Sequence, residues 1–165
     1  MKQLLIALAL ALPFAAQAAE FNTLQADKSS IAFTYKQMGV AIDGKFKRFS
    51  SQLSFDPTKP TAAKASFDVE LASVDTGAPE GDDEVAGRSW FNTKAFPMAK
   101  FVSTGVKVLG GNKYEVTGQL SIKGKTQDVV VPASFTAQGN SGIFVGSFTC
   151  RRADFSIGEG SWAKF

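Results

Sequence analysis

The sequence predicts an all-β protein, an antiparallel up-and-down β-barrel with one short helical excursion. Three observations support this. Apolar and polar residues alternate along most of the chain, short glycine-containing turns separate the alternating segments, and only one stretch departs from the pattern. A period of two is what a half-buried strand requires, and short turns place successive strands side by side and antiparallel. A β-sandwich is the competing architecture.

The amino terminus predicts a cleavable signal peptide over residues 1–18. A positive start at Lys2 is followed by an apolar run over 4–16, and Ala16-Gln17-Ala18 has the small-x-small form that signal peptidase accepts. The run is shorter than the roughly 20 residues that a transmembrane helix needs. We therefore expect a periplasmic protein with no transmembrane segment and a single domain over residues 19–165.

Seven strands are expected in the domain. In one of them Phe67, Val69 and Leu71 share a face opposite charged residues, and between residues 40 and 56 the alternation changes phase. A bulge or bend near 47–50 would reconcile the two phases and curve the sheet. The expected strands lie at residues 30–38, 40–56, 63–71, 100–110, 112–124, 127–138 and 142–155.

The segment 74–97 is the exception to the strand pattern. Asp82, Asp83 and Glu84 suit a first helical turn and Arg88 suits the other end, so the sequence predicts a short helix near 81–91. Apolar rings flank this helix before Pro97 returns the chain to a strand; they are Trp90, Phe91 and Phe96.

Composition excludes several function classes. The chain contains no histidine, which rules out Ser-His and Cys-His nucleophile systems and histidine-ligated zinc or haem. Its 18 basic and 15 acidic residues give a formal charge of +3 with interspersed lysines, so no nucleic-acid surface is indicated. Cys150 is the only cysteine and cannot form an internal disulfide. Its apolar surroundings predict a buried side chain, and a homodimer through Cys150 remains possible.

The sequence offers weak candidates for catalysis or metal binding. The acidic residues 82–84 fit a helix start better than a general acid, and a solvated Lys123 or Lys125 beside Ser121 is no base. Residues 75–84 hold enough oxygens for calcium but lack a recognised loop spacing. We expect no catalytic residue, no metal and no cofactor, and a histidine-free hydrolase is the least favoured function.

Large rings gather at inward positions of the predicted strands. They could simply fill the core of a small barrel, or they could line a cavity that holds one ligand. Alternation alone leaves these two readings open. The inward rings are Phe33, Phe46, Phe55, Phe67, Phe135 and Phe148.

Three stretches in succession resemble the YceI family of exported lipocalin-like barrels: "WFNTKAFPMAKFVS", "GQLSIKGKTQDVVVPASF" and "RRADFSIGEGSW". The resemblance implies an eight-stranded barrel whose interior holds a polyisoprenoid or a related long-chain lipid. The family continues beyond the "GEGSWAKF" stretch into a final strand, so we expect this domain to lack that strand. Its first and seventh strands would then have unpaired edges, unless a partner closes the seam.

The resemblance and the inward pattern together give the expected ligand-binding residues. Trp90, Phe91 and Phe96 would lie near the mouth, where Arg88, Ser103 or Arg152 could meet a polar head group. The expected function is an exported carrier of a long isoprenoid or acyl lipid; an extracytoplasmic interaction domain with a filled core is the alternative. The complete expected set is Phe33, Phe46, Phe67, Val69, Leu71, Trp90, Phe91, Phe96, Phe101, Leu120, Ile122, Val131, Phe135 and Phe148.

Overall fold

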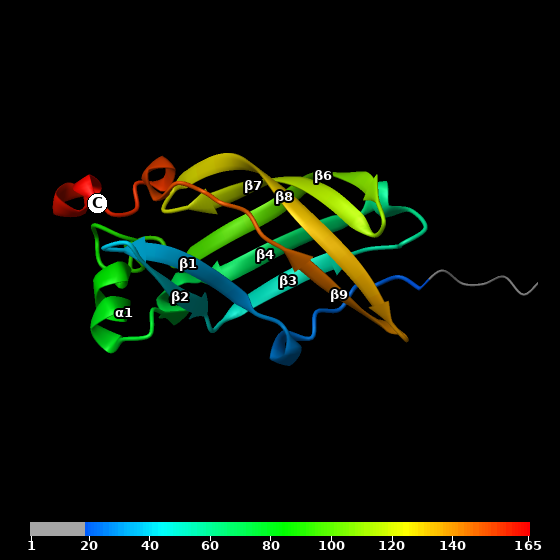
Figure 1. Cartoon of the computed structure of the whole chain (residues 1–165), viewed down its shortest axis with the longest axis horizontal. Coiled ribbons are helices and arrows are strands. Elements are labelled where there is room, and N and C mark those ends of the chain that lie inside the picture. The colour runs from blue at the N-terminus through cyan, green and yellow to red at the C-terminus, as the bar shows by residue number, and fades with distance from the viewer. Residues whose placement is uncertain (1–18) are drawn as a thin grey trace, which may run out of the picture.

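The computed structural model describes residues 19–165, so the predicted signal peptide lies outside the described residues. Antiparallel strands dominate the fold and a single α-helix interrupts them (Figure 1). The strands are β1 Ile31–Gln37, β2 Val40–Phe46, β3 Phe49–Ser54, β4 Lys64–Glu70, β5 Val74–Asp75, β6 Met98–Gly110, β7 Lys113–Ile122, β8 Lys125–Gln138 and β9 Ser141–Gly146. The helix is α1 Pro79–Ala86, and short 3-10 turns are η1 Ala26–Lys28, η2 Pro60–Ala62, η3 Leu71–Ser73, η4 Arg152–Phe155 and η5 Gly160–Lys164.

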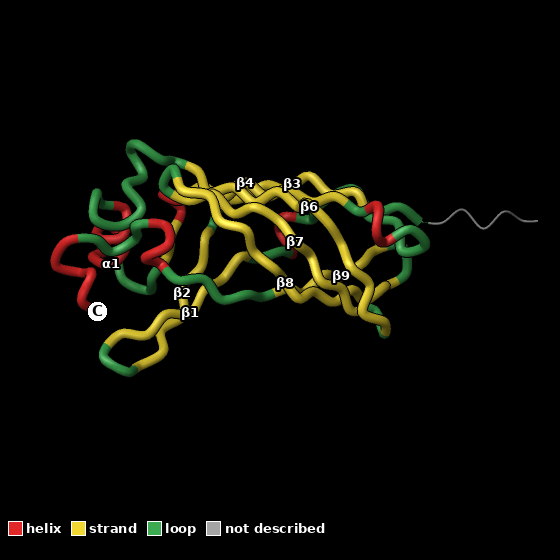
Figure 2. The backbone as a smooth tube through the Cα atoms, turned by 90° about the horizontal axis from the view of Figure 1, so that it is seen from above, coloured by secondary structure: helices red, strands yellow, loops and turns green. Residues whose placement is uncertain are grey.

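The strands form two antiparallel sheets that together curl into a half-barrel (Figures 1 and 2). The larger sheet has the order β3-β4-β6-β7-β8-β9, and the smaller has the order β1-β2-β5. Within residues 19–165 no pairing joins β1 to β9, so these two strands are the edges of the half-barrel. The all-β antiparallel fold with one short helix is thereby confirmed.

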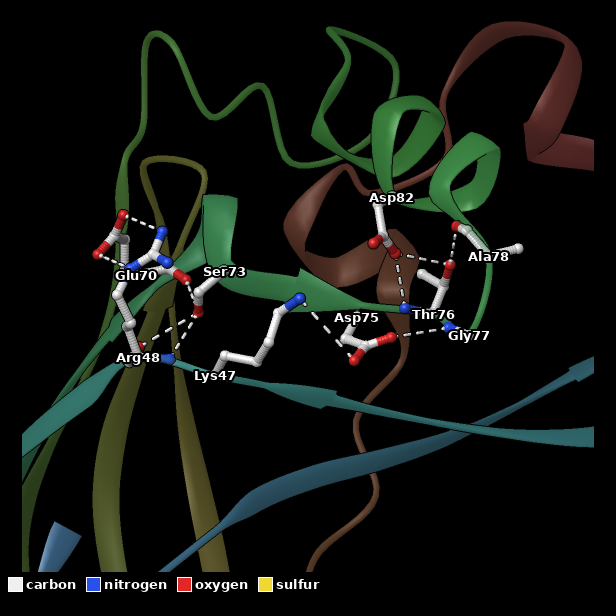
Figure 3. Close-up of polar contacts among 9 residues, drawn as sticks. All are labelled: Lys47, Arg48, Glu70, Ser73, Asp75, Thr76, Gly77, Ala78 and Asp82. Carbon is white, nitrogen blue, oxygen red and sulfur yellow. Dashed lines mark hydrogen bonds and ion pairs between the residues drawn. The ribbon is translucent and has the colours of Figure 1, made fainter. Parts of the chain in front are cut away.

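The predicted bend at 47–50 is a break between β2 and β3, which belong to different sheets. Ser73 pins this corner, because its hydroxyl accepts the Arg48 N–H at 2.9 Å and donates to the Glu70 carbonyl at 2.7 Å (Figure 3). The Arg48 guanidinium adds two hydrogen bonds to the Glu70 carboxylate, at 2.8 and 2.7 Å. Ser73 is 1 % exposed, and its buried hydroxyl is fully hydrogen-bonded. Hydrogen bonds, and not packing alone, therefore stabilise the corner.

The predicted helix near 81–91 is misplaced, since α1 spans residues 79–86. Pro79 starts it, because proline has no backbone N–H and suits a first helical position. The helix stops at Gly87, and the chain then turns back, with the Phe91 N–H bonded to the Val85 carbonyl. Sequence reasoning placed residues 87–91 in the helix because nothing in their apolar pattern marks this reversal.

The last predicted strand, 142–155, is too long. β9 ends at Gly146, and the chain continues without strand pairing before η4 begins at Arg152. Cys150 lies in this segment and is exposed, so its predicted burial is wrong. No helix among residues 19–165 combines the length and apolar content needed to cross a bilayer.

Candidate functional site

The register of the large sheet brings apolar residues from different strands onto one surface, here called the inner face. Phe67 of β4 lies opposite Phe101 of β6, which lies opposite Leu120 of β7. Directly paired residues project to the same side of a sheet, so these three side chains form one row across three strands. Further residues of the inner face are Leu53, Ala65, Val69, Ala99, Ser103, Val106, Tyr114, Val116, Gly118, Ile122, Val129, Val131, Ala133, Phe135 and Phe144.

Two buried clusters close the ends of the inner face. The far-end cluster has Phe55, Tyr114 and Phe135 at its centre, with the Phe55 and Phe135 ring centroids 4.9 Å apart. The mouth cluster, beside the segment that follows α1, has Leu120, Phe155, Ile157, Trp90, Phe91, Phe101, Ile122 and Val129. Each cluster excludes water from one end of the half-barrel.

Between the clusters the inner face remains partly open to solvent. Phe67, Val116 and Val131 are half-buried there, whereas Phe55 in the far-end cluster is only 3 % exposed. Several outer members of the two clusters, such as Phe101 and Val129, are half-buried as well, so only the cluster centres are fully covered. An apolar surface that remains partly accessible has unsatisfied capacity for burial. This is the main physical property of the candidate site.

Glycines on the walls let aromatic rings lie flat against the backbone. A Cβ at Gly118 would overlap the ring of Phe101 and approach the Val102 carbonyl oxygen at 2.7 Å. The Phe33 ring occupies the same kind of space over Gly44 on the neighbouring strand. These rings thus occupy the space that a side chain at each glycine would fill.

The mouth cluster also holds polar groups. Arg152 lies with its guanidinium 5.4 Å from the Trp90 ring centre and donates to the carbonyls of Ile157 and Gly158 at 2.9 Å and of Trp162 at 2.8 Å. These bonds engage Arg152 in the fold. The Trp90 indole N–H, in contrast, is buried without a hydrogen-bond partner among residues 19–165.

The other predicted head-group residues are not poised at the mouth. Ser103 lies on the inner face, where its hydroxyl accepts the Ala65 N–H at 2.9 Å. This bond sits at a register shift in β6 between Ser103 and Gly105. Arg88 is exposed and has no ion pair in the part of the chain that the structure describes.

The prediction that Lys123 is solvated is wrong. Its side chain is 8 % exposed, and its ammonium donates to the Ser156 carbonyl at 2.7 Å and to the Glu159 carboxylate at 2.9 Å. The hydrogen bond from Lys123, and then its charge, lower the pKa of Glu159. Lys123 therefore ties the β7–β8 turn to the carboxyl-terminal segment.

The acidic residues of α1 serve the local fold. One oxygen of Asp82 accepts the backbone N–H of Thr76 at 2.7 Å and its hydroxyl at 2.8 Å (Figure 3). These bonds lower the pKa of Asp82, whereas a general acid needs a raised pKa. Asp83 and Glu84 are exposed on the helix.

The predicted ligand-binding residues divide by position. Phe33 and Phe46 lie on the β1–β2 hairpin with ring centroids 5.3 Å apart, and Phe96 lies over the β7–β8 turn. Phe67, Val69, Phe101, Leu120, Ile122 and Val131 lie on the inner face, and Trp90 and Phe91 lie in the mouth cluster.

Three predicted residues lie apart from the partly open surface. Leu71 is 1 % exposed beside the corner formed at Ser73, and Phe135 is 4 % exposed in the far-end cluster. Phe148 follows β9 and is 42 % exposed. The alternation of apolar and polar residues predicted that all three side chains point inward. Alternation does not distinguish an inward position that is tightly packed from one that a ligand can reach.

Sequence reasoning missed part of the site. Phe144 lies opposite Phe135 and its ring packs 4.9 Å from that of Phe55, and Val116 lies opposite Val131. The alternation in their strands could have identified both. Phe155 and Ile157 follow no such pattern, because they come from a 3-10 turn and its exit.

Two open depressions indent the surface outside the predicted set. One, of about 630 Å³, lies between η2 and the register shift of β6. The other, of about 480 Å³, is lined by residues 151–165. Neither contains any of the fourteen predicted ligand-binding residues.

Comparisons of the sequence with a family model and with known proteins point to the same family. The family model described as the YceI-like domain matches residues 23–164. A UPF0312 protein of Azotobacter vinelandii is 38 % identical over 96 residues, which cover 58 % of this chain and 50 % of that protein. The chain thus matches half the length of that relative.

Solved structures share the fold. The crystal structure of Burkholderia cenocepacia BcnA is 40 % identical with a TM-score of 0.84, covering 86 % of this chain and 89 % of that chain. A polyisoprenoid binding domain from Saccharophagus degradans is 14 % identical with a TM-score of 0.51, covering 74 % of this chain and 66 % of that domain.

Proposed function

The chain belongs to the YceI-like domain family, and on that premise we propose that it is a carrier that binds one long hydrocarbon chain, of isoprenoid or acyl type, along its inner face. The partly open apolar surface between the two buried clusters carries the proposal. The polyisoprenoid binding domain with the same fold supports a ligand of this class.

The size of the inner face favours a long ligand. From Tyr114 in one cluster to Leu120 in the other, β7 rises roughly 20 Å at about 3.4 Å per residue. Burial of a five-carbon isoprene unit is worth roughly 4 kcal/mol, at about 0.8 kcal/mol per methylene-sized group. Association costs on the order of 4–15 kcal/mol, so several units must be buried for useful affinity.

A polar head group would find one donor at the mouth. The unpartnered Trp90 indole N–H could be satisfied by an oxygen of the ligand, such as a carbonyl or phosphate oxygen. Arg152 contributes indirectly, by holding its planar guanidinium near the indole ring.

The proposal includes export to the periplasm, supported by the form of residues 1–18. Sequencing the amino terminus of the protein recovered from the periplasmic fraction tests it. A mature chain beginning at Ala19 is expected, and retention of Met1 in the cytoplasmic fraction would contradict export.

Native mass spectrometry followed by solvent extraction tests the carrier function. Protein purified from its own host should carry about one hydrocarbon lipid per chain, and the lipid-free protein should take up a C20 isoprenoid alcohol with the same stoichiometry. Protein that is recovered empty and does not take up the alcohol would instead favour an interaction domain with a filled core.

A further inference from the structure

We propose that the tip of the β1–β2 hairpin, residues 38–40, docks on the surface of an anionic lipid bilayer. The proposal deepens the proposed carrier function by naming where the protein would exchange its hydrocarbon. The hairpin projects from the body of the molecule, at the end where α1 and the carboxyl terminus lie (Figures 1 and 2).

The side chains at this tip are apolar and accessible. Met38 is 99 % exposed and Val40 is 63 % exposed. Met38 has more exposed surface in relative terms than any other large apolar side chain among residues 19–165. Neither residue is there to fill the protein's own core.

The backbone of the turn makes the choice of methionine unusual. Met38 and Gly39 form a two-residue hairpin turn with φ of +51° and +83°. Such turns favour Asn-Gly, because asparagine tolerates the left-handed region better than methionine. The turn thus keeps an exposed apolar side chain where a polar one would fit the backbone better, which indicates a contact outside the chain.

An apolar stripe connects the tip with the mouth cluster. Tyr35 lies opposite Ile42 and Phe33 opposite Gly44, so the inner side of the hairpin carries rings and branched side chains along its length. The Phe33 ring packs 6.1 Å from that of Tyr35 and 5.3 Å from that of Phe46, which lies 6.0 Å from Phe91. A hydrocarbon leaving a bilayer at the tip would meet apolar contacts all the way to the mouth.

Charge and area favour a bilayer over a protein partner. Between positions 31 and 46 the hairpin carries Lys36, Asp43 and Lys45, a net charge of 2 − 1 = +1, and Lys36 is the charged residue nearest the tip, so an anionic surface attracts the tip. Two exposed side chains present far less than the roughly 1,200 Å² of a stable protein interface. Shallow insertion of a few apolar side chains beside a cation suits reversible contact with lipid.

Flotation with vesicles of phosphatidylglycerol and phosphatidylethanolamine tests the proposal, using protein from which bound lipid has been extracted. The variant Met38→Asn, Val40→Thr should lower the fraction bound at least tenfold, and 0.5 M salt should weaken binding of the wild type. Asparagine suits the left-handed position, so the variant should keep the wild-type circular dichroism spectrum and Tm. Val145→Thr is the matched control, because Val145 is also 63 % exposed but lies on β9.

Absence of wild-type flotation, or equal flotation of the double variant, would overturn the proposal. It also falls if the double variant abolishes only a self-associated species seen by sedimentation velocity, since the tip would then contact a second copy. The carrier function is scored separately by extraction. A protein that retains lipid but does not bind vesicles would refute only the docking proposal. A protein that binds vesicles but never carries lipid would refute only the carrier function.

Discussion

Gly118→Ala tests whether the Phe101 ring is held against the wall of the half-barrel. The added Cβ would overlap that ring and approach the Val102 carbonyl oxygen at 2.7 Å, and a backbone atom moves less readily than a side chain. Overpacking of this kind costs about 1–3 kcal/mol, and the lower entropy of the unfolded alanine chain offsets about 0.4–1 kcal/mol. Because the overlap involves a backbone oxygen, we expect the cost to lie in the upper part of that range, about 2–3 kcal/mol, which leaves a net loss of about 1–2.5 kcal/mol. Each kcal/mol lost should lower the Tm by roughly 2–4 °C.

Urea unfolding followed by tryptophan fluorescence measures this loss, and Gly105→Ala provides the control in the neighbouring strand. A Cβ at Gly105 meets only the Thr117 hydroxyl, at 3.1 Å, and that side chain can rotate, so a change within about 0.5 kcal/mol is expected. Gly118→Ala should also lower lipid retention, because the Phe101 ring, which already lies on the inner face, would be displaced into the space proposed for the lipid. Wild-type stability of Gly118→Ala, or a larger loss in Gly105→Ala, would refute the reasoning.

Three further substitutions probe the site and its supports. Leu120→Trp should displace bound lipid, as measured by extraction. Val130→Trp is the control and should retain the lipid, because Val130 lies on the outer side of β8 and is 50 % exposed. Equal lipid retention by the two variants would contradict the placement of Leu120 on the inner face. The pKa of Asp82 is lower in the folded protein than its ordinary value of about 3.8. The ionised carboxylate therefore stabilises the fold at pH values above 3.8, and this stabilisation is lost as the pH falls through the lower pKa of the folded state. Asp82→Asn should therefore flatten the decline of the urea midpoint below about pH 4, and an unchanged decline would exclude the Thr76 contact as its source. Arg152→Lys should lower the free energy of unfolding by about 1.5–3 kcal/mol, because one ammonium nitrogen would replace the two guanidinium nitrogens, Nη1 and Nη2, that bond the carbonyl oxygens of Ile157, Gly158 and Trp162. A loss below about 0.5 kcal/mol would contradict this role.

Local patterns predicted five of the seven expected strands closely, because a strand with one dry face must alternate. The expected strand 40–56 is divided between β2 and β3, the last expected strand is too long, and the short β5 was not predicted. The phase change before Phe49 similarly indicated a corner, since one continuous strand cannot keep both sets of apolar residues on one side. The polar contacts that hold the corner could not be predicted, because Ser73 lies far from Arg48 in sequence.

Predictions failed where contacts distant in sequence decide the outcome. Lys123 reads as a surface lysine, but a carboxyl-terminal turn folds over it and supplies Ser156 and Glu159 as acceptors. Phe148 and Cys150 continue an apolar run, yet strand pairing ends at Gly146. Alternation identifies which side of a strand is apolar, but not whether another element covers that side.

Structure determination of the protein loaded with a C20 isoprenoid alcohol tests the central claim most directly. The account predicts continuous ligand density along the inner face, in contact with Phe67, Leu120 and Val131 and ending at the two buried clusters. Density confined to the outer surface, or an inner face whose side chains close on one another and leave the alcohol unbound, would contradict it.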